Sequence, residues 1–132
     1  MREIKFRALK DDMSNFNWVY GMLIYQGEHD RTPRIQSGFS DLFTSCVKGT
    51  EGQFTGLKDE NGLDVYEGDI IKYDNGTIAE VIFKDGGFCG YDGYASSSDE
   101  AYLLLVAEET PFENTDFEIE VIGNIHENKD LL

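Results

Sequence analysis

The chain has 132 residues, of which 40% are hydrophobic and 28% charged, and its 26 acidic side chains outnumber 11 basic ones to give a formal charge of −15. This length favours a single domain, and the balance of apolar and charged residues is typical of a globular protein. The negative charge argues against direct binding to nucleic acid or to an anionic membrane, because both partners require a cationic surface.

Several sequence features indicate the cellular compartment in which the protein works. No stretch approaches the ~18 apolar residues of a membrane span, and no signal-peptide apolar segment follows the N-terminus. We therefore expect a cytoplasmic protein with no membrane partner. Cys46 and Cys89 have no CxxC spacing, and cytosolic chains of this size rarely carry structural disulfides, so both are expected to be small residues of the core or sheet.

Charge is distributed unevenly along the sequence. Residues 1 to 50 hold seven basic and six acidic side chains, for a net charge of +1, whereas residues 51 to 132 hold four and 20, for −16. All four arginines precede residue 35. Because arginine binds carboxylates and phosphates through bidentate hydrogen bonds, any binding site for such a group is expected in the N-terminal part of the chain.

The first half of the chain contains two strand patterns. Residues 3 to 8 alternate charged and apolar side chains, which predicts a strand with Ile4, Phe6 and Ala8 on its buried face. Residues 18 to 25 form a second β-rich run, apolar at both parities, so that both of its faces can be covered. Around residues 26 to 52 the pattern is lost, and we expect a poorly ordered connection there.

The middle of the chain predicts hairpins at Asn61-Gly62 and Asn75-Gly76, because Asn-Gly pairs tolerate the backbone of tight turns. Residues 69 to 74 and 77 to 84 are expected to pair around the second turn. In the strand that leaves this turn, alternation places Ala79, Val81 and Phe83 on the core face. A valine at Gly76 is expected to destabilise the protein more than a valine at Gly52, which lies in the irregular region.

The last third continues the β pattern. Residues 102 to 106 form a five-residue apolar run that favours a strand, with a helix over residues 101 to 109 as the rival interpretation. Residues 117 to 125 predict another strand, followed by a short C-terminal helical turn. Short strands separated by Gly, Asn and Asp turns predict a mainly β fold: an antiparallel meander forming a small, partly open barrel. Its beginning at Glu67-Gly68-Asp69 is typical of SH3-like barrels.

Three blocks of sequence are distinctive. They read MREIKFRA at residues 1–8, QFTGLKDENG continuing through VYEGDIIK over residues 53–72, and EVIGNIHEN at residues 120–128. In this order they resemble the YopX family of small bacteriophage and prophage proteins. The chain departs from the family pattern at Leu9, where tryptophan is usual, and at Lys129, where proline is usual, and residues 26 to 52 match it poorly.

The resemblance implies one domain over residues 1–132, derived from a phage and located in the host bacterial cytoplasm. It implies a mainly β fold whose biochemical role is unknown, with no catalytic residues to transfer.

Signals for catalysis or metal binding are weak in the residues themselves. His29, His126 and the two cysteines form no zinc spacing, the acidic turn before Gly62 fails as a calcium loop, and no phosphate-binding glycine loop occurs, so no metal or cofactor is expected. Acidic pairs two residues apart, at Glu67/Asp69 and Glu118/Glu120, have the geometry of a two-carboxylate hydrolase. A solvated sheet surface is the favoured interpretation of both pairs.

An aromatic set is the candidate interaction surface, and it consists of Phe88, Tyr91, Tyr94 and Tyr102. Acidic neighbours argue against a platform for single-stranded nucleic acid, which needs a cationic groove. A protein interface suits the set better, with core packing as the alternative. We therefore expect a non-enzymatic protein-interaction or self-associating module with a protein partner or a homo-oligomer. The alternatives are an acidic nucleic-acid mimic that occupies a host DNA-binding protein and a carboxylate-dependent hydrolase.

Overall fold

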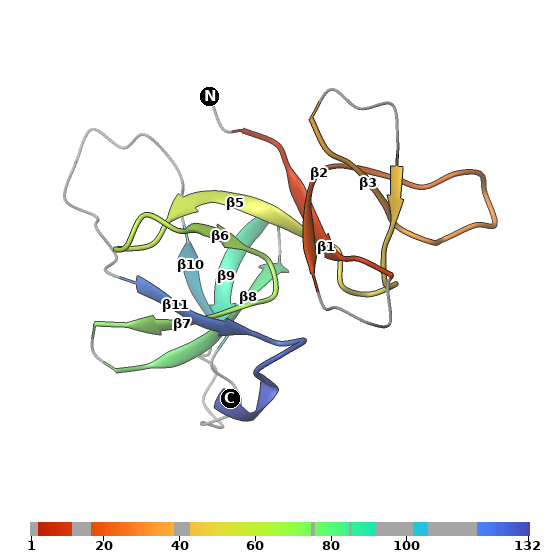
Figure 1. The fold of residues 1–132 in the computed structure, drawn as a ribbon. Coiled ribbons are helices and arrows are strands. Elements are labelled where there is room, and N and C mark those ends of the chain that lie inside the picture. The colour runs from red at the N-terminus through yellow and green to blue at the C-terminus, as the bar shows by residue number, and fades with distance from the viewer. Residues whose placement is uncertain are drawn as a thin grey trace. The chain divides into compact units, whose positions relative to one another are not determined.

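The computed structural model describes residues 3–11, 17–38, 43–74, 76–84, 86–91, 102–105 and 119–132. Within these ranges the protein is mainly β, with antiparallel strands and a single 3-10 turn, which confirms the predicted fold class (Figure 1). The chain divides into an N-terminal unit, Glu3–Phe54, and a C-terminal unit, Thr55–Leu132, each described by itself. The expectation of a single domain stays a prediction.

The N-terminal unit is built on four strands in the order β4-β3-β2-β1, with the start of a fifth strand paired to β1. These strands are β1 (Phe6–Leu9), β2 (Trp18–Ile24), β3 (Arg34–Gln36), β4 (Phe43–Ser45) and β5 (Gly52–Lys58). The strands β3 and β4 lie inside the segment that the sequence predicts to be poorly ordered. Each has only three residues, too few for alternation to reveal them.

The two edges of this sheet meet at the ends of β1 and β4. Lys10 and Cys46 form an antiparallel bridge, and the Val47 N–H donates to the Leu9 carbonyl at 2.8 Å. The Thr50 hydroxyl oxygen lies beside this junction and accepts the Leu9 N–H at 3.0 Å. The sheet therefore closes into a small barrel, which pairs edge groups that would otherwise remain open to other strands.

The interior of this barrel is small and apolar. Ala8, Ile35 and Cys46 are buried in it, and Phe6, Val19 and Leu23 pack against them. Alternation along β1 thus correctly predicts Phe6 and Ala8, but it is wrong for Ile4, which precedes the strand and is exposed. Cys46 is a free thiol, as is the buried Cys89 of the other unit, and burial raises the pKa of the Cys46 thiol.

The C-terminal unit contains a five-stranded antiparallel sheet, half of a barrel, in the order β10-β9-β8-β7-β11. A hairpin of the end of β5 and β6 completes the unit. The additional strands are β6 (Asp64–Tyr66), β7 (Asp69–Tyr73), β8 (Ile78–Lys84), β9 (Gly87–Tyr91), β10 (Tyr102–Leu105) and β11 (Ile119–Asn124). The strand interpretation of residues 102 to 106 is confirmed for β10, and its helical rival is wrong.

The predicted hairpin around Gly76 is confirmed by the pairing of β7 with β8. The Gly76 N–H donates to the Tyr73 carbonyl at 2.9 Å, and the Tyr73 N–H donates to the Thr77 carbonyl at 2.8 Å. Gly76 has φ of 91°, in the left-handed region. This combination is typical of a three-residue hairpin loop that ends on a glycine.

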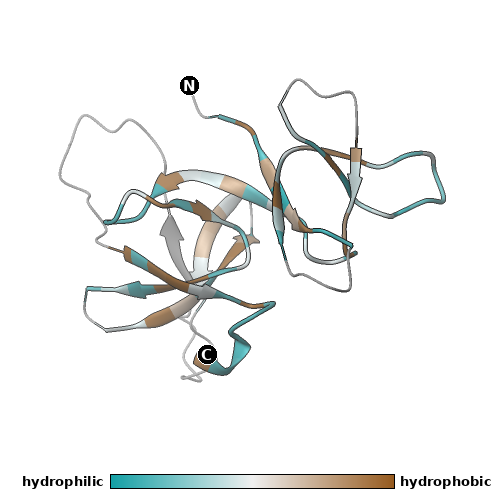
Figure 2. Cartoon of the chain, viewed as in Figure 1, coloured by the Kyte–Doolittle hydropathy of each residue, from teal (hydrophilic) through white to brown (hydrophobic). Residues whose placement is uncertain are grey.

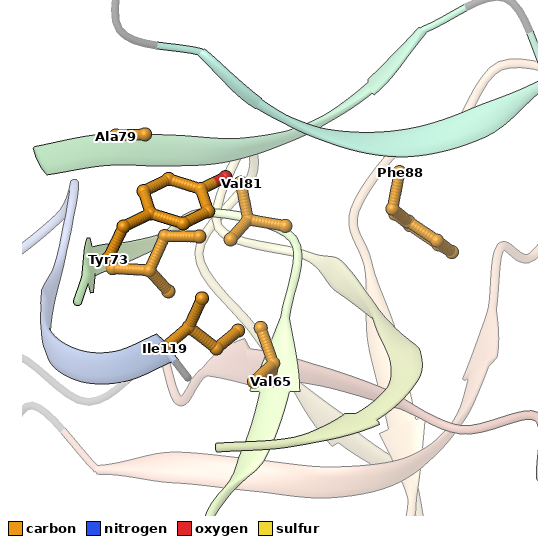
Figure 3. Packing of buried hydrophobic residues seen from close by; sticks show 7 residues of the cluster. Val65, Tyr73, Ala79, Val81, Phe88 and Ile119 are labelled. Carbon is orange, nitrogen blue, oxygen red and sulfur yellow. The ribbon is translucent and has the colours of Figure 1, made fainter. Parts of the chain in front are cut away.

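The core of the C-terminal unit gathers side chains from five strands, and Figure 3 shows those of Val65, Tyr73, Val81 and Ile119 turned toward one another. The core residues are Val65, Ile71, Tyr73, Ala79, Val81, Phe88 and Ile119. Ala79 and Val81 are buried as predicted, but Phe83 is 53% exposed, so its assignment to the core is wrong. Phe83 lies near the β8–β9 turn, where its ring meets that of Phe88 edge-on at 5.2 Å between centroids.

A buried carboxylate joins the β5–β6 turn to β11. Asp59 Oδ1 accepts the N–H groups of Asn61 at 2.9 Å and Leu63 at 2.8 Å, and its Oδ2 accepts the Val121 N–H at 3.0 Å. The neighbouring Glu60 N–H donates to the Ile119 carbonyl at 3.0 Å. One side chain therefore holds together segments that lie 62 residues apart in sequence.

The chain after β11 is held by asparagine side chains. Asn124 Oδ1 accepts the N–H groups of His126 and Glu127, both at 3.0 Å, and the Ile125 N–H donates to the Gly68 carbonyl at 2.9 Å. The predicted C-terminal helical turn is the 3-10 turn Lys129–Leu131. Figure 2 shows the hydrophilic character of this last segment, which contrasts with the apolar strands before it.

Gly76 offers a test of the hairpin that involves the backbone alone, because a Cβ built there would have nothing within 4 Å. We expect Gly76→Val to lower the free energy of unfolding by on the order of 1 kcal/mol or more. Gly76→Asn should cost clearly less, because asparagine tolerates the left-handed region. Urea unfolding measures both, and equal losses would contradict this account. Gly52 is a poor comparison because it is a buried residue of β5.

Replacing Asp59 tests the carboxylate that joins the turn to β11. Asp59→Ala leaves three backbone N–H groups without their acceptor, so we expect it to lower the free energy of unfolding by roughly 2 to 4 kcal/mol. Glu60→Ala removes an exposed carboxylate from the same turn and should change stability by no more than about 0.5 kcal/mol. Denaturant titration of both variants provides the measurement, and similar small losses would show that the Asp59 carboxylate does not hold β11.

Candidate interaction surface

The aromatic set predicted from the sequence does not form one surface. Phe88 is only 3% exposed and belongs to the core, so its assignment to an interaction surface is wrong. Phe88 lies an odd number of residues before the half-buried Tyr91, so alternation along β9 puts their side chains on opposite faces of the sheet. The register places Tyr91 opposite Tyr102, whose side chain lies outside the described residues, as does all of Tyr94. For Tyr91, Tyr94 and Tyr102 the surface stays a prediction.

The carboxylates proposed for a hydrolase have other roles or positions. Glu67 lies in the turn between β6 and β7, and not on a strand face. Asp69 is 1% exposed, and its Oδ2 accepts the Tyr66 N–H at 2.8 Å, so it stabilises this same turn. Glu120 is exposed on β11, and Glu118 falls outside the described residues. Asp69 therefore serves the fold, and the pair carries no argument for catalysis.

The described ranges contain neither a metal-binding cluster nor a membrane-spanning helix. No group of three or more His, Cys, Asp or Glu side chains in these ranges could hold a metal ion. Among the same residues, no helix has the length and apolar character needed to cross a membrane.

Exposed apolar side chains gather in the N-terminal unit. Six of the nine large ones in the described chain belong to it, and they are Ile4, Tyr20, Met22, Tyr25, Phe43 and Val47. Charge shows the opposite distribution: residues 3–54 hold six basic and seven acidic side chains, for −1, whereas residues 55–132 hold four and 19, for −15. The less charged unit thus holds most of the large exposed apolar side chains of the described residues.

Three of these residues share the outer face of the barrel. Tyr20 and Met22 alternate with inward-facing residues along β2, and the register places Met22 opposite Gln36, which in turn is opposite Phe43. Tyr20 is 48%, Met22 51% and Phe43 39% exposed. We call Tyr20, Met22 and Phe43 together the outer face.

Two arginines near the outer face each contact a partner within the N-terminal unit. The Arg7 guanidinium lies 4.2 Å from the Trp18 ring centroid, and Arg34 Nη2 lies 3.0 Å from Asp30 Oδ2. Hydrogen bonds from Thr32 and then from Arg34 lower the pKa of Asp30 to about 2, so its carboxylate is charged at neutral pH. The arginines near this face therefore already have partners within the unit.

Sequence reasoning identified the β2 run but could not choose its outer side. Both parities of the run are apolar or aromatic, so alternation alone does not separate the core from the surface. Phe43 was missed because it lies in the segment where no strand was predicted. The pairing of β2 with β3 and of β3 with β4 is the information that joins these residues.

The second and third distinctive sequence blocks meet within the C-terminal unit. Asp59 and Gly68 of the second block bond to Val121 and Ile125 of the third. The polar residues of these blocks thus build turns and inter-strand contacts, and none of the hydrogen bonds described for them forms a reactive site.

These features define a small, mainly β protein of antiparallel strands whose distinctive motifs determine its fold. The family model described as "YopX protein" matches residues 5–132, and the chain belongs to the YopX family. It is similar in fold to the crystal structure of protein EF1440 from Enterococcus faecalis, with a TM-score of 0.53 and 21% identity over 100% of this chain and 99% of that one. No curated protein matches the chain.

The hydroxyl of Tyr25 gives a pH readout of the N-terminal unit. It donates to Glu51 Oε2 at 2.7 Å, and burial followed by Glu51 raises its pKa from 10.0 to about 12. The pKa of Tyr25 is higher in the folded than in the unfolded protein. The stability that the Tyr25–Glu51 hydrogen bond contributes is therefore complete below pH 10 and is lost as the pH rises toward about 12.

Ultraviolet titration of the native protein and of Tyr25→Phe should therefore differ by one tyrosine that ionises near pH 12. A difference centred near pH 10 would show that the Tyr25–Glu51 contact does not persist in solution.

Proposed function

We propose that this YopX-family protein is a non-enzymatic protein-interaction module whose partner binds the outer face. The observation that carries the proposal is the clustering of Tyr20, Met22 and Phe43 on one face of a closed sheet. Isolated exposed apolar residues are ordinary, whereas contiguous ones mark interaction sites. Tyrosine, phenylalanine and methionine are also enriched at protein interfaces, whose centres are depleted of charge.

The barrel provides a rigid support for such a face. The junction of β1 with β4 joins both edges of the sheet, and the Arg7 guanidinium packs over the ring of Trp18 at the start of β2. A preorganised surface loses little conformational entropy when a partner binds. As part of the same proposal, we expect this partner in a bacterial cytoplasm, which is what the family resemblance implies.

The charge of the C-terminal unit favours a second candidate function. Residues 55–132 carry −15, enough to attract a basic protein and to imitate a nucleic-acid backbone. Such a partner would be a host DNA-binding protein held by charge, and salt would release it. Binding at the outer face rests on apolar contact and depends much less on salt.

Site-specific photo-crosslinking distinguishes the two functions. A crosslinking side chain replaces Met22 on the outer face or Phe83 in the C-terminal unit, which have matched exposures of 51% and 53%. In bacterial cytosol at low and high salt, we expect a defined crosslinked protein from position 22 at both salt concentrations, identified by mass spectrometry, and none from position 83.

Products from position 83 alone that disappear at high salt would favour the acidic mimic. An absence of products from position 22 would refute binding at the outer face.

A further inference from the structure

We infer that Asn61 is a site of spontaneous deamidation, and that the Asp59 carboxylate delays the reaction for as long as β11 stays attached. Asparagine is a chemically labile residue, and a following glycine favours its deamidation because it has no side chain to hinder the attacking nitrogen. Asn61 and Gly62 are both exposed, and a Cβ built at Gly62 would have nothing within 4 Å. The turn is therefore open to the water that the reaction consumes.

The reaction needs only the chain itself and water. The amide nitrogen of Gly62 loses its proton and attacks Cγ of Asn61. The new C–N bond closes a succinimide ring, while the Cγ–Nδ2 bond breaks and ammonia leaves with the proton. Water then opens the ring. Cleavage between the ring nitrogen and Cγ gives aspartate, whereas cleavage between the nitrogen and the main-chain carbonyl carbon gives isoaspartate, whose main chain is longer by a methylene group.

The folded turn holds the attacking nitrogen away from Cγ. The Gly62 N–H donates to the Asp59 carbonyl at 3.0 Å, the Asp59 N–H donates to the Leu63 carbonyl at 2.8 Å, and Gly62 has φ of 83°. This pattern is typical of a type I turn that ends on a left-handed glycine, in which the preceding residue has ψ of about 0°. Ring closure requires Cβ of Asn61, instead of its nitrogen, to eclipse the Gly62 nitrogen, so the Cα–C bond has to rotate by roughly 120° from the turn conformation.

The Asp59 carboxylate opposes this rotation. Its Oδ1 accepts the N–H groups of Asn61 and Leu63, which lie on either side of the bond that has to rotate. Both N–H groups cannot keep the same acceptor when that bond turns. Oδ2 of the carboxylate binds the Val121 N–H of β11 at 3.0 Å, so β11 helps to hold the carboxylate in place. Detachment of β11 therefore removes a restraint on the reaction.

Deamidation in turn weakens the attachment of β11. Isoaspartate lengthens the main chain between the two N–H groups that share Oδ1 of Asp59. Either product also adds a negative charge next to Glu60 and close to Asp59, and like charges repel. Modification of Asn61 and detachment of β11 therefore promote each other, and the modified fraction records how long the turn has been open.

The second Asn-Gly pair of the chain provides an internal reference. The hairpin around Gly76 has the same two backbone bonds, in which Tyr73 takes the position of Asp59. The Tyr73 side chain is buried in the core and supplies no carboxylate to the turn. Both asparagines, Asn61 and Asn75, follow an acidic residue, so the two pairs should react alike in the unfolded chain. In the folded protein, Asn75 should react sooner.

Timed incubation of the full chain at neutral pH, followed by peptide mapping with mass spectrometry, measures deamidation at both positions. We expect Asn61 to react about tenfold more slowly than Asn75 in the native protein, the factor that a hydrogen bond to a charged group supplies, and equally fast in urea. Asp59→Ala should raise the rate at Asn61 about tenfold and leave that at Asn75 unchanged. Glu60→Gln removes a charge from the same turn, but none of these acceptors, and should change neither rate.

Hydrogen exchange of the Val121 amide tests the coupling independently. Asn75→Gln confines the modification to position 61, because glutamine deamidates much more slowly, and the Val121 amide should then exchange faster in the modified fraction. The variant that also carries Asn61→Gln should keep its protection through the same incubation.

A rate at Asn61 equal to that at Asn75 in the native protein overturns the inference, as does an unchanged rate at Asn61 in folded Asp59→Ala. If circular dichroism shows that Asp59→Ala is unfolded, the Val121 amide decides. Faster exchange after modification of Asn61 then supports the inference, and unchanged exchange overturns it.

Discussion

The Asp59 carboxylate is the constraint on which the C-terminal unit depends. Burying a carboxylate is costly unless donors satisfy it, and here the donors are backbone N–H groups of the turn and of β11. Because β11 lies at one end of the sheet order, this contact fixes the last strand to the β5–β6 hairpin. It acts together with the pairing of β11 and β7, which places Ile119 opposite Tyr73 and Asn124 opposite Asp69.

The residues that carry the family motifs lie apart from the proposed binding surface. The blocks at residues 53–72 and 120–128 are occupied in turns and inter-strand bonds, so they specify the frame. The outer face takes Phe43 from a segment outside these blocks. Membership in the YopX family therefore establishes the fold and carries no partner to this chain, and the binding surface has to be argued from exposure and charge.

Local chemistry made the middle of the chain predictable. The Asn75-Gly76 turn and the alternation after it determine the pairing of β7 with β8, because both signals act within a few residues. Long-range contacts determine the rest: β3 and β4 are strands because the barrel closes around Ile35, and Phe83 is exposed because it lies near the turn where β8 ends. An aromatic residue such as Phe88 fits a core and an interface equally well, so its burial could not be predicted from sequence. The outer face could not be predicted because both parities of β2 are apolar or aromatic and because the sequence pattern reveals no strand at Phe43.

The closure of the N-terminal barrel has a consequence for the order of events during translation. The contacts of β1 with β4 need only residues up to 47, whereas Asp59 finds its partner only when Val121 has been synthesised. Contacts close in sequence form sooner than distant ones, and domains fold as they emerge from the ribosome. The N-terminal barrel can therefore close on the nascent chain and present its outer face while the C-terminal sheet is still incomplete.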